Sequence, residues 1–339
     1  MLGSSDVPLA ERYDLAMLDL DGVVYVGGDA VPGAPAHLER ARDAGQRIAF
    51  ITNNAARPPE RVAEHLRDLG VEAGTEDVVT SAQAAARVLG DRFGAGARVV
   101  LLGSDGLRSA LAEQGLVPVG VDDEAVAVVT GYGPEVLWRD IMRVAVRVRE
   151  GLAWVASNRD YTIPTAYGVA PGHGVLVETI ERFSGITPTT AGKPERPLLD
   201  ETVRRVGGRQ PLMVGDRLDT DIEGACNAGI DSLLVLTGVT GLTELVAAKP
   251  GERPTYLAPD LAGLTEPCTA PEVDGAVVAL GGWTAEVRDG ALAVSGEGAP
   301  ADWWRVVAVA GWNHLDEAGE PADAAQLTPP PASSGSADG

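Results

Sequence analysis

The sequence predicts an α/β protein with a Rossmann-like, doubly wound parallel sheet at its core. Short apolar runs alternate with helical stretches along most of the chain, and each run is apolar throughout. A strand of this kind is buried on both faces, as in a parallel sheet that helices cover on both sides. Several runs end at polar or glycine-rich turns, and open α/β sheets bind their ligands at such strand ends.

The expected strands share this continuous apolar character, and they cover residues 15–20, 47–52, 98–103, 125–131, 152–157, 211–216 and 232–238. Helical patterns separate them, at residues 35–45, 58–70, 81–89, 107–114 and 134–150. The prolines at the start of the second helical pattern suit the first turn of a helix.

Residues 271–315 have a different character. Residues 283–296 predict a β-hairpin closed by Asp289-Gly290, a dipeptide suited to a type I′ turn, and 301–315 predict a helix. Four of the six tryptophans lie in this segment, which favours packing onto the main body or a second subunit over an aromatic ligand site. The Ala/Pro/Ser/Gly composition of 317–339 predicts a disordered tail.

Composition limits the partners and the compartment. With 49 acidic and 27 basic residues among 339, the net charge is −22, which argues against a nucleic acid or an anionic membrane as partner. Cys226 and Cys268 cannot build a disulfide framework, and no signal peptide or membrane-length apolar run is evident. We therefore expect a soluble protein of the cytoplasm, which needs local donors or a metal to bind an anion.

Asp19 and Asp21 follow the first predicted strand. Asp-x-Asp alone is as often a solvated turn as a site. Asp19 nevertheless interrupts a buried apolar run, and an unpaired buried carboxylate is costly. It therefore needs a metal or a cationic partner.

Two further segments offer groups that bind phosphate. Thr52-Asn53 follows the second strand, where a hydroxyl and a backbone amide can donate hydrogen bonds; the commoner alternative is a helix cap. Gly192-Lys193-Pro194 places an ammonium group that can neutralise a phosphate, although an ordinary exposed lysine is the simpler reading. Lys193 is one of only two lysines in the chain.

Asp216, Asp219 and Asp221 follow the strand at 211–216. Acidic residues in such a turn cap helices as often as they bind metal, but their oxygens are the ligands that magnesium takes. Together the four segments supply a nucleophile, a proton shuttle, donors, a cation and metal ligands, the parts that phosphoryl transfer requires.

The chain resembles the haloacid dehalogenase (HAD) superfamily of phosphatases. Its four motifs occur in order, as DLDGVVY (19–25), ITNN (51–54), GKP (192–194) and GDRLDTDI (215–222). The last motif, the TNN and the Asn158-Arg159-Asp160 segment resemble the NagD or p-nitrophenyl-phosphatase branch.

The resemblance implies a domain plan. Residues 1–82 and 189–265 would form the phosphatase core, and 83–188 an inserted C2-type α/β cap. The small α+β extension at 271–315 resembles the half-acetyltransferase-like extension of actinobacterial glycerol-3-phosphate phosphatases. It lacks the glycine-rich acetyl-CoA loop, which argues against acetyl transfer.

The resemblance also implies residue roles. Asp19 would attack phosphorus and become an aspartyl phosphate, and Asp21 would be the general acid and then the general base. Mg²⁺ would be held by Asp19, the Asp21 carbonyl and Asp216, with Asp221 supporting the metal shell. Thr52, the Asn53 amide and Lys193 would hold the phosphoryl group.

The expected reaction is hydrolysis of a small phosphate monoester, with glycerol 3-phosphate as the first candidate. Phosphoglycolate, sugar phosphates, nucleoside monophosphates and, in vitro, p-nitrophenyl phosphate stay open. Asn158 and Asp160, with the turn at 172–174, are expected to face the substrate, or else to form a plain turn of the cap. A phospho-accepting signalling domain and a binding protein are the alternatives from other classes. Dimerisation through the tryptophan-rich extension is worth testing.

Overall fold

The computed structural model describes residues 1–165 and 168–331. The chain divides into two compact units. The first contains residues 1–48, 69–71 and 208–339, and the second contains 49–68 and 72–207. These limits differ from the expected division into core and cap, because the second unit also contains residues 49–68 and 72–82. The limits of a cap at 83–188 therefore stay a prediction.

The first unit is built on parallel strands in the order β15-β14-β13-β1. Strand β1 (Leu15–Leu18) pairs with β13 (Pro211–Gly215), with Leu18 opposite Val214. All four residues of β1 are buried, as its apolar run predicted. The other two strands are β14 (Asp231–Val235) and β15 (Tyr256–Ala258).

Short helices and a small hairpin complete this part of the first unit. They are α1 (Leu9–Arg12), β2 (Tyr25–Val26), β3 (Asp29–Ala30), α2 (Ala34–Asp43), a π-helical turn (Leu218–Ile222), α9 (Glu223–Ala228), α10 (Leu242–Val246) and 3₁₀ turns at Pro250–Glu252 and Leu261–Leu264.

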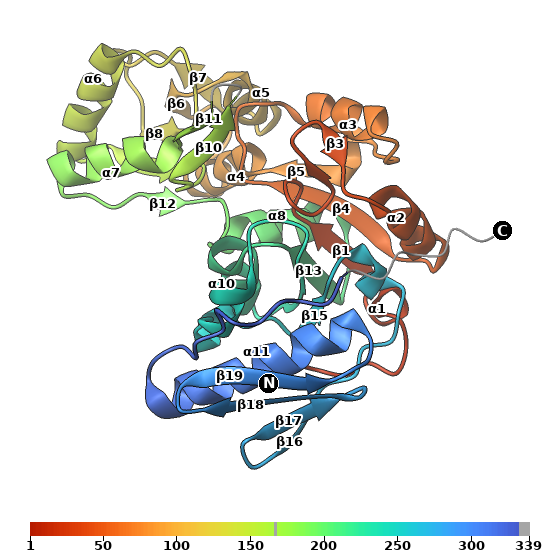
Figure 1. Cartoon of the computed structure of the whole chain (residues 1–339). Coiled ribbons are helices and arrows are strands. Elements are labelled where there is room, and N and C mark those ends of the chain that lie inside the picture. The colour runs from red at the N-terminus through yellow and green to blue at the C-terminus, as the bar shows by residue number, and fades with distance from the viewer. Residues whose placement is uncertain (166–167, 332–339) are drawn as a thin grey trace. The chain divides into compact units, whose positions relative to one another are not determined.

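The C-terminal extension is an antiparallel sheet with one helix. The predicted hairpin is confirmed as β18 (Trp283–Arg288) and β19 (Ala291–Gly296), and positive φ at both turn residues, 50° at Asp289 and 79° at Gly290, is what a type I′ turn requires. Strands β16 (Glu272–Asp274) and β17 (Val277–Leu280) extend the sheet and were not predicted. Helix α11 (Pro300–Ala318) packs along it (Figure 1).

The tryptophans of the extension pack onto the body of the first unit. Trp303 and Trp312 are buried in one apolar cluster with residues of α10 and β15. The indole Nε1 of Trp312 donates to the carbonyl of Leu245 at 2.7 Å. Packing, the simpler expectation for these residues, accounts for both.

The predicted start of the disordered tail, at residue 317, is too early in the sequence. Helix α11 ends at Ala318, and Ala322 and Ala324 are buried in the same apolar cluster. Asp323 exchanges backbone hydrogen bonds with Gly290 and Leu292, at 2.8 and 2.9 Å. The segment up to Leu327 is therefore held by apolar burial and β-bridging that its composition does not reveal. The rest of the expected tail, 332–339, lies outside the described residues.

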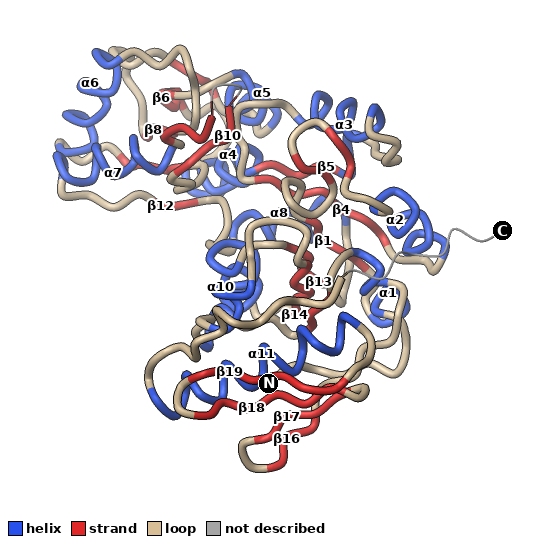
Figure 2. The backbone as a smooth tube through the Cα atoms, viewed as in Figure 1, coloured by secondary structure: helices blue, strands red, loops and turns tan. Residues whose placement is uncertain are grey.

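The second unit contains two groups of parallel strands (Figure 2). Strand β4 (Arg47–Thr52), of which residues from 49 onward belong here, pairs with β5 (Val78–Thr80). A second sheet has the order β12-β9-β8-β6-β7, with strands at Thr189–Thr190, Ala153–Ala156, Ala127–Thr130, Arg98–Leu102 and Val117–Val119.

Helices pack around these strands. They are α3 (Pro59–Asp68), α4 (Ser81–Phe93), α5 (Asp105–Glu113), α6 (Trp138–Arg149), α7 (His173–Ser184) and α8 (Pro197–Val206), with a 3₁₀ turn at Thr75–Asp77. A hairpin of β10 (Thr162–Thr165) and β11 (Gly168–Pro171) precedes α7. Helices α7 and α8 were not predicted.

The predicted fold class is confirmed. Parallel strands alternate with helices in both units, and every strand predicted as an apolar run is present, with each end at most three residues from its predicted position. Among the described residues, no helix combines the length and the apolar character needed to cross a membrane.

Candidate active site

Asp19 and Asp216 follow two neighbouring parallel strands of the first unit. The backbone N–H of Asp19 donates to the carbonyl of Val214 at 2.9 Å, so the β1–β13 ladder continues to this residue. Asp216 comes directly after β13. Because parallel strands end at the same edge of a sheet, both carboxylates lie at the edge where open α/β sheets bind ligands.

Asp221 reaches the same place from a π-helical turn. The N–H of Ile222 donates to the carbonyl of Arg217 at 3.1 Å, which is the wider spacing of a π turn. The Asp221 side chain folds back, and its Oδ2 accepts from the N–H of Arg217 at 3.1 Å. A residue five positions after Asp216 therefore faces it.

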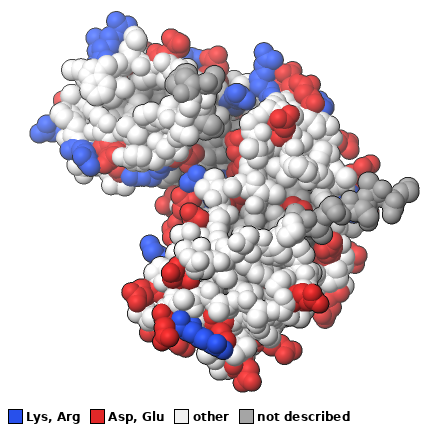
Figure 3. Space-filling view, viewed as in Figure 1, with Lys and Arg blue, Asp and Glu red and all other residues white. Residues whose placement is uncertain are grey.

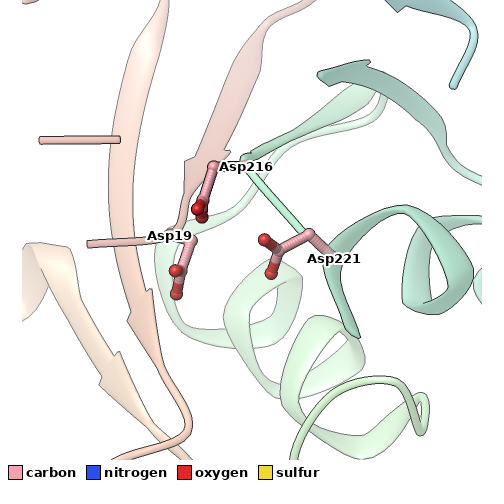
Figure 4. Close-up of side chains that lie close together, drawn as sticks. All are labelled: Asp19, Asp216 and Asp221. Carbon is pink, nitrogen blue, oxygen red and sulfur yellow. The ribbon is translucent and has the colours of Figure 1, made fainter. Parts of the chain in front are cut away.

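The three carboxylates form a cluster (Figure 4). One oxygen from each of Asp19, Asp216 and Asp221 lies within 4.8 Å of the other two. Asp216 and Asp221 are fully buried, and Asp19 is half-buried. Three negative groups at this spacing repel one another strongly away from bulk water, and a divalent cation bound between them removes that repulsion. An all-oxygen ligand set is the kind that Mg²⁺ takes, so these residues fit the expected ion.

Two glycines, Gly22 and Gly238, lie against the Asp216 carboxylate. A methyl group at Gly238 would lie 2.0 Å from Asp216 Oδ2, and one at Gly22 would lie 2.4 Å from it. The N–H of Val239 donates to the same oxygen at 2.6 Å, and the hydroxyl of Thr240 donates to the Asp216 carbonyl at 2.6 Å. The loop 237–240 thus holds this carboxylate in place.

Sequence reasoning missed the loop 237–240. It overlaps the end of the predicted strand 232–238, since β14 ends at Val235, and it carries threonine and glycine, the same signal of a strand end with small polar residues that marked the other segments. It contains no acidic residue, so nothing in it indicated a metal site.

Asp21 lies two residues beyond Asp19, in a turn. Gly22 adopts φ 84°, a left-handed conformation that favours glycine, and its N–H donates to the carbonyl of Tyr25 at 2.8 Å. The hydroxyl of Thr237 donates to the Gly22 carbonyl. Asp21 is exposed and is not one of the three clustered carboxylates, which leaves its side chain accessible to a ligand.

In the second unit the structure brings Asn53 and Lys193 together. The Asn53 amide donates to the Lys193 carbonyl at 3.0 Å, and the Lys193 N–H donates to the Asn53 side-chain oxygen at 2.8 Å. A methyl group at Gly192 would lie 2.5 Å from that oxygen, so only glycine fits there. Lys193 is 3% exposed. Thr52, also buried, accepts at Oγ1 from the N–H of Asn54 at 3.1 Å.

Asn158 and Asp160 join this group. The side-chain amide of Asn53 also donates to Asp160 Oδ1 at 3.0 Å. The side-chain amide of Asn158 donates to the backbone carbonyl of Asn53 at 2.6 Å. Asn158 Oδ1 accepts from the N–H of Asp160 at 3.1 Å. Both residues therefore support Asn53, and contact with a substrate stays a prediction.

The turn at 172–174 fixes the segment around Asn158. Methyl groups at Gly172 and Gly174 would lie 2.3 Å from the carbonyl oxygens of Asp160 and Arg159, respectively. Between them, His173 is buried, and its Nδ1 lies 2.9 Å from the Asn158 carbonyl. Because a carbonyl only accepts, Nδ1 carries the proton. Burial lowers the pKa of His173 to about 4, against the hydrogen bond to Asn158, which raises it.

Apart from Asp21, the predicted site residues thus form two groups. Asp19, Asp216 and Asp221 form a carboxylate cluster in the first unit. Thr52, Asn53, Lys193, Asn158 and Asp160 belong to the second unit, where hydrogen bonds link Asn53 to the last three.

Comparison with known proteins decides the family. The sequence profile of haloacid dehalogenase-like hydrolases matches residues 16–117, and a second, HAD-hydrolase-like profile matches 190–264. The chain belongs to the haloacid dehalogenase-like hydrolases. The predicted superfamily and the enzyme class of hydrolase are confirmed.

Relatives with named activities extend over most of the chain. A D-glycerol 3-phosphate phosphatase of Mycobacterium tuberculosis is 42% identical over 294 residues, covering 86% of this chain and 80% of that protein. An acid sugar phosphatase of Staphylococcus aureus is 34% identical over 74% of this chain and 96% of its own length.

Solved structures agree with these relatives. The crystal structure of the glycerol phosphate phosphatase of M. tuberculosis in complex with magnesium has a TM-score of 0.83 at 40% identity, over 93% of this chain and 94% of that one. A 4-nitrophenylphosphatase of Thermotoga maritima has a TM-score of 0.70 at 30% identity, over 76% of this chain and 98% of that one.

Proposed function

We propose that this hydrolase cleaves a small phosphate monoester with Mg²⁺, through an aspartyl phosphate on Asp19. The observation that carries the proposal is the carboxylate cluster, in which Asp19 follows β1 and lies within 4.8 Å of both Asp216 and Asp221. An accessible carboxylate beside two buried ones suits a nucleophile at a cation site.

Asp19 attacks phosphorus, and the ester oxygen leaves. Asp21 donates the proton that the leaving alkoxide needs, and then accepts a proton from the water that hydrolyses the phosphoaspartate. The exposed turn of Asp21, two residues from the nucleophile, supports this exchange of protons. The products are the free alcohol and inorganic phosphate.

Asp19, the backbone carbonyl of Asp21 and Asp216 would hold Mg²⁺, with Asp221 supporting them. When bound, the ion offsets the repulsion between a carboxylate nucleophile and an anionic ester. Thr52, the backbone amide of Asn53 and Lys193 would hold the phosphoryl oxygens, and the ammonium of Lys193 adds the positive charge that a chain of net charge −22 requires.

Glycerol 3-phosphate is the proposed substrate. The relative of that activity is 42% identical over 86% of this chain, and its magnesium-bound structure aligns over 93% of it. The acid sugar phosphatase and 4-nitrophenylphosphatase relatives keep other small esters as alternatives.

The remaining proposals concern setting and partners. Residues 83–188 would act as a cap that limits substrate size and excludes water. The acidic charge supports a cytoplasmic protein without nucleic-acid or membrane partners. Homodimerisation, which the tryptophan-rich extension at 271–315 makes worth testing, is also a proposal.

A phosphate-release panel tests the function. Glycerol 3-phosphate, phosphoglycolate, a sugar phosphate, a nucleoside monophosphate and p-nitrophenyl phosphate are compared with Mg²⁺ and with EDTA. We expect continuous, Mg²⁺-dependent release with glycerol 3-phosphate turned over best. Glycerol 3-phosphate at the bottom of the panel rejects the substrate, whereas stoichiometric labelling without turnover indicates a phospho-accepting signalling domain.

The nearly isosteric Asp19→Asn change tests the nucleophile. It should abolish release by at least about a thousandfold while leaving the circular dichroism spectrum unchanged. Preserved steady-state turnover in this variant would rule out the covalent route without affecting the assignment of the substrate.

A further inference from the structure

Segment 158–160 holds Asn53 at two places. The Asn158 side chain donates to the backbone carbonyl of Asn53 at 2.6 Å, and Asp160 Oδ1 accepts from the Asn53 side chain at 3.0 Å. Asn53 in turn exchanges two hydrogen bonds with the backbone of Lys193. The position of this segment therefore affects both Asn53 and Lys193, which are proposed to hold the phosphoryl group.

The segment lies at the edge where two neighbouring parallel strands end. Strand β9 ends at Ala156, and its neighbour β12 ends at Thr190, three residues before Lys193. The N–H of Ala191 donates to the Ala156 carbonyl at 2.9 Å, so the two strands stay paired up to this edge. The loops that follow the two strands therefore start side by side.

The first turn of helix α7 holds the segment through two hydrogen bonds. The N–H of Gly174 donates to the Asp160 carbonyl at 2.8 Å, and His173 Nδ1 donates to the Asn158 carbonyl at 2.9 Å. Both donors lie at the start of the helix. They fix the segment at one end of α7, and a contact further along the helix fixes its direction.

Arg159 and Glu181 supply that third contact. Glu181, seven residues after Gly174, accepts from both terminal nitrogens of Arg159, at 2.8 and 2.6 Å. A bidentate pair of this kind fixes orientation as well as distance, which a lysine could not do. The Glu181 side chain is 18% exposed, and that of Arg159 is 41% exposed.

The partner of Arg159 is selected among several acidic neighbours. Charged side chains of both signs are interspersed where α7 lies, on the face drawn in Figure 3. The hydrogen bond to Glu181 is the largest effect that raises the pKa of Arg159, against burial, which lowers it. The charges of Glu195 and Glu178 raise it less. The bidentate geometry therefore singles out Glu181.

We propose that Arg159 and Glu181 are positioning residues for phosphate-ester hydrolysis. Their pair fixes the segment on α7, the segment fixes Asn53, and Asn53 fixes the backbone of Lys193. In this role neither Arg159 nor Glu181 touches the reacting atoms. The inference rests on the proposed function, since the Asn53 amide and Lys193 are proposed there to hold the phosphoryl oxygens.

Loss of the pair should affect activity and stability differently. An exposed ion pair adds little to stability. A misplaced charged group at a phosphoryl site costs more, up to about 100-fold in rate for a displacement of about 1 Å. Loss of the pair should therefore lower activity strongly and stability slightly, whereas a purely structural pair would lower activity only as far as it lowers the folded fraction.

Glu181→Gln removes the charge and one of the two acceptors with little change in shape. We expect kcat/KM for glycerol 3-phosphate to fall about tenfold. Inhibition by inorganic phosphate should weaken by a similar factor, because the product uses the same donors. The Mg²⁺ concentration for half-maximal activity should stay unchanged, since the carboxylate cluster belongs to the first unit.

Asp316→Asn is the matched control. Asp316 also accepts from both terminal nitrogens of an arginine, Arg253, both at 2.7 Å, but it lies on helix α11 of the first unit. This variant should keep the parent's kcat/KM and phosphate inhibition. The urea midpoint of unfolding should shift little in either variant. Equal losses of kcat/KM in the two variants, or a loss in Glu181→Gln that only follows a lowered folded fraction, overturns the proposal.

A comparison of esters separates positioning from contact with the substrate. The phosphoryl group is common to all phosphate esters. Arg159→Lys and Glu181→Gln should therefore lower kcat/KM for glycerol 3-phosphate and for p-nitrophenyl phosphate by the same factor. A loss confined to glycerol 3-phosphate would mean that Arg159 contacts the alcohol part of the ester, and it overturns the proposal.

Exchange of the two charges tests the pair itself. Arg159→Glu and Glu181→Arg should each lower kcat/KM at least about tenfold, and the double variant should recover part of the loss. A double variant no more active than the single variants overturns the proposal. All these outcomes are read in an active parent, so they are distinct from failure of the proposed function, in which the parent releases no phosphate from any ester and both inferences fall.

Discussion

Asn53 and Lys193 are joined by two reciprocal hydrogen bonds. The side-chain amide of Asn53 donates to the Lys193 carbonyl, and the Lys193 N–H donates back to the Asn53 side-chain oxygen, at 3.0 and 2.8 Å. Lys193 is 140 residues further along the chain, so the Asn53 side chain joins two loops that are distant in the sequence. The residue that follows the proposed phosphate-binding Thr52 thereby fixes the backbone of the proposed phosphate-binding lysine.

Asn53→Ala should therefore misplace Lys193. We expect kcat/KM for phosphate-ester hydrolysis to fall by about 10- to 100-fold, because small displacements of a charged group cost that much. The apparent affinity for Mg²⁺ should stay unchanged, since the clustered carboxylates are untouched. Asn54→Ala is the control: the exposed Asn54 side chain accepts from the N–H of Ala56 and touches neither group. Equal losses in both variants would contradict a positioning role for Asn53.

Gly238 is one of the two glycines that lie against the Asp216 carboxylate, and a larger residue there should disturb the proposed metal site. In Gly238→Ala the new methyl group would lie 2.0 Å from Asp216 Oδ2, so the carboxylate must move. We expect the Mg²⁺ concentration for half-maximal activity to rise at least about tenfold, as outer-shell changes at metal sites do.

Gly28→Ala is the matched control, because a methyl group there meets open space and Gly28 has no positive φ. It should leave activity and its Mg²⁺ dependence unchanged. An unaltered Mg²⁺ requirement in Gly238→Ala would show that Asp216 is not a ligand.

The sequence predicted the fold class because a buried parallel strand leaves a strong local signal. The run at 47–52 is found as β4 with the same limits, and Asp19 was singled out because it interrupts such a run. Strands of two or three residues, such as β12 and β16, carry too little pattern to be recognised. Their pairing depends on neighbours that are distant in the sequence.

The sequence predicted which residue types form the site but not the contacts that hold them in place. Acidic residues and a lysine at strand ends are visible one by one. The role of Val239 depends on a backbone N–H that almost any residue could supply, and that of Gly238 on the absence of a side chain next to a residue distant in the sequence. Asn158 was expected to face a substrate, and the structure shows its amide donating to the Asn53 carbonyl. Contacts across 105 residues have no local signature.

His173 predicts how stability depends on pH. Its pKa is lowered to about 4 by burial, whereas an unfolded histidine titrates near 6.5. Between these values the unfolded chain binds a proton that the folded chain does not, so the free energy of unfolding falls as pH drops, by at most ~3 kcal/mol. His173→Asn keeps a donor for the Asn158 carbonyl and removes the titration. In urea unfolding it should lose less stability than the parent between pH 7 and pH 4.5; parallel losses would show that another group dominates.

Asp21→Asn separates the two chemical steps. The amide cannot donate a proton to an alkoxide, so hydrolysis of glycerol 3-phosphate should slow by about 100- to 10,000-fold. p-Nitrophenolate leaves without protonation, so the first step with p-nitrophenyl phosphate should persist while water attack on the phosphoaspartate fails. Stopped-flow absorbance should then show a burst of about one nitrophenolate per chain, and intact mass should show one added phosphoryl group. Asp19→Asn should show neither signal, and a burst in that variant would place the acceptor elsewhere.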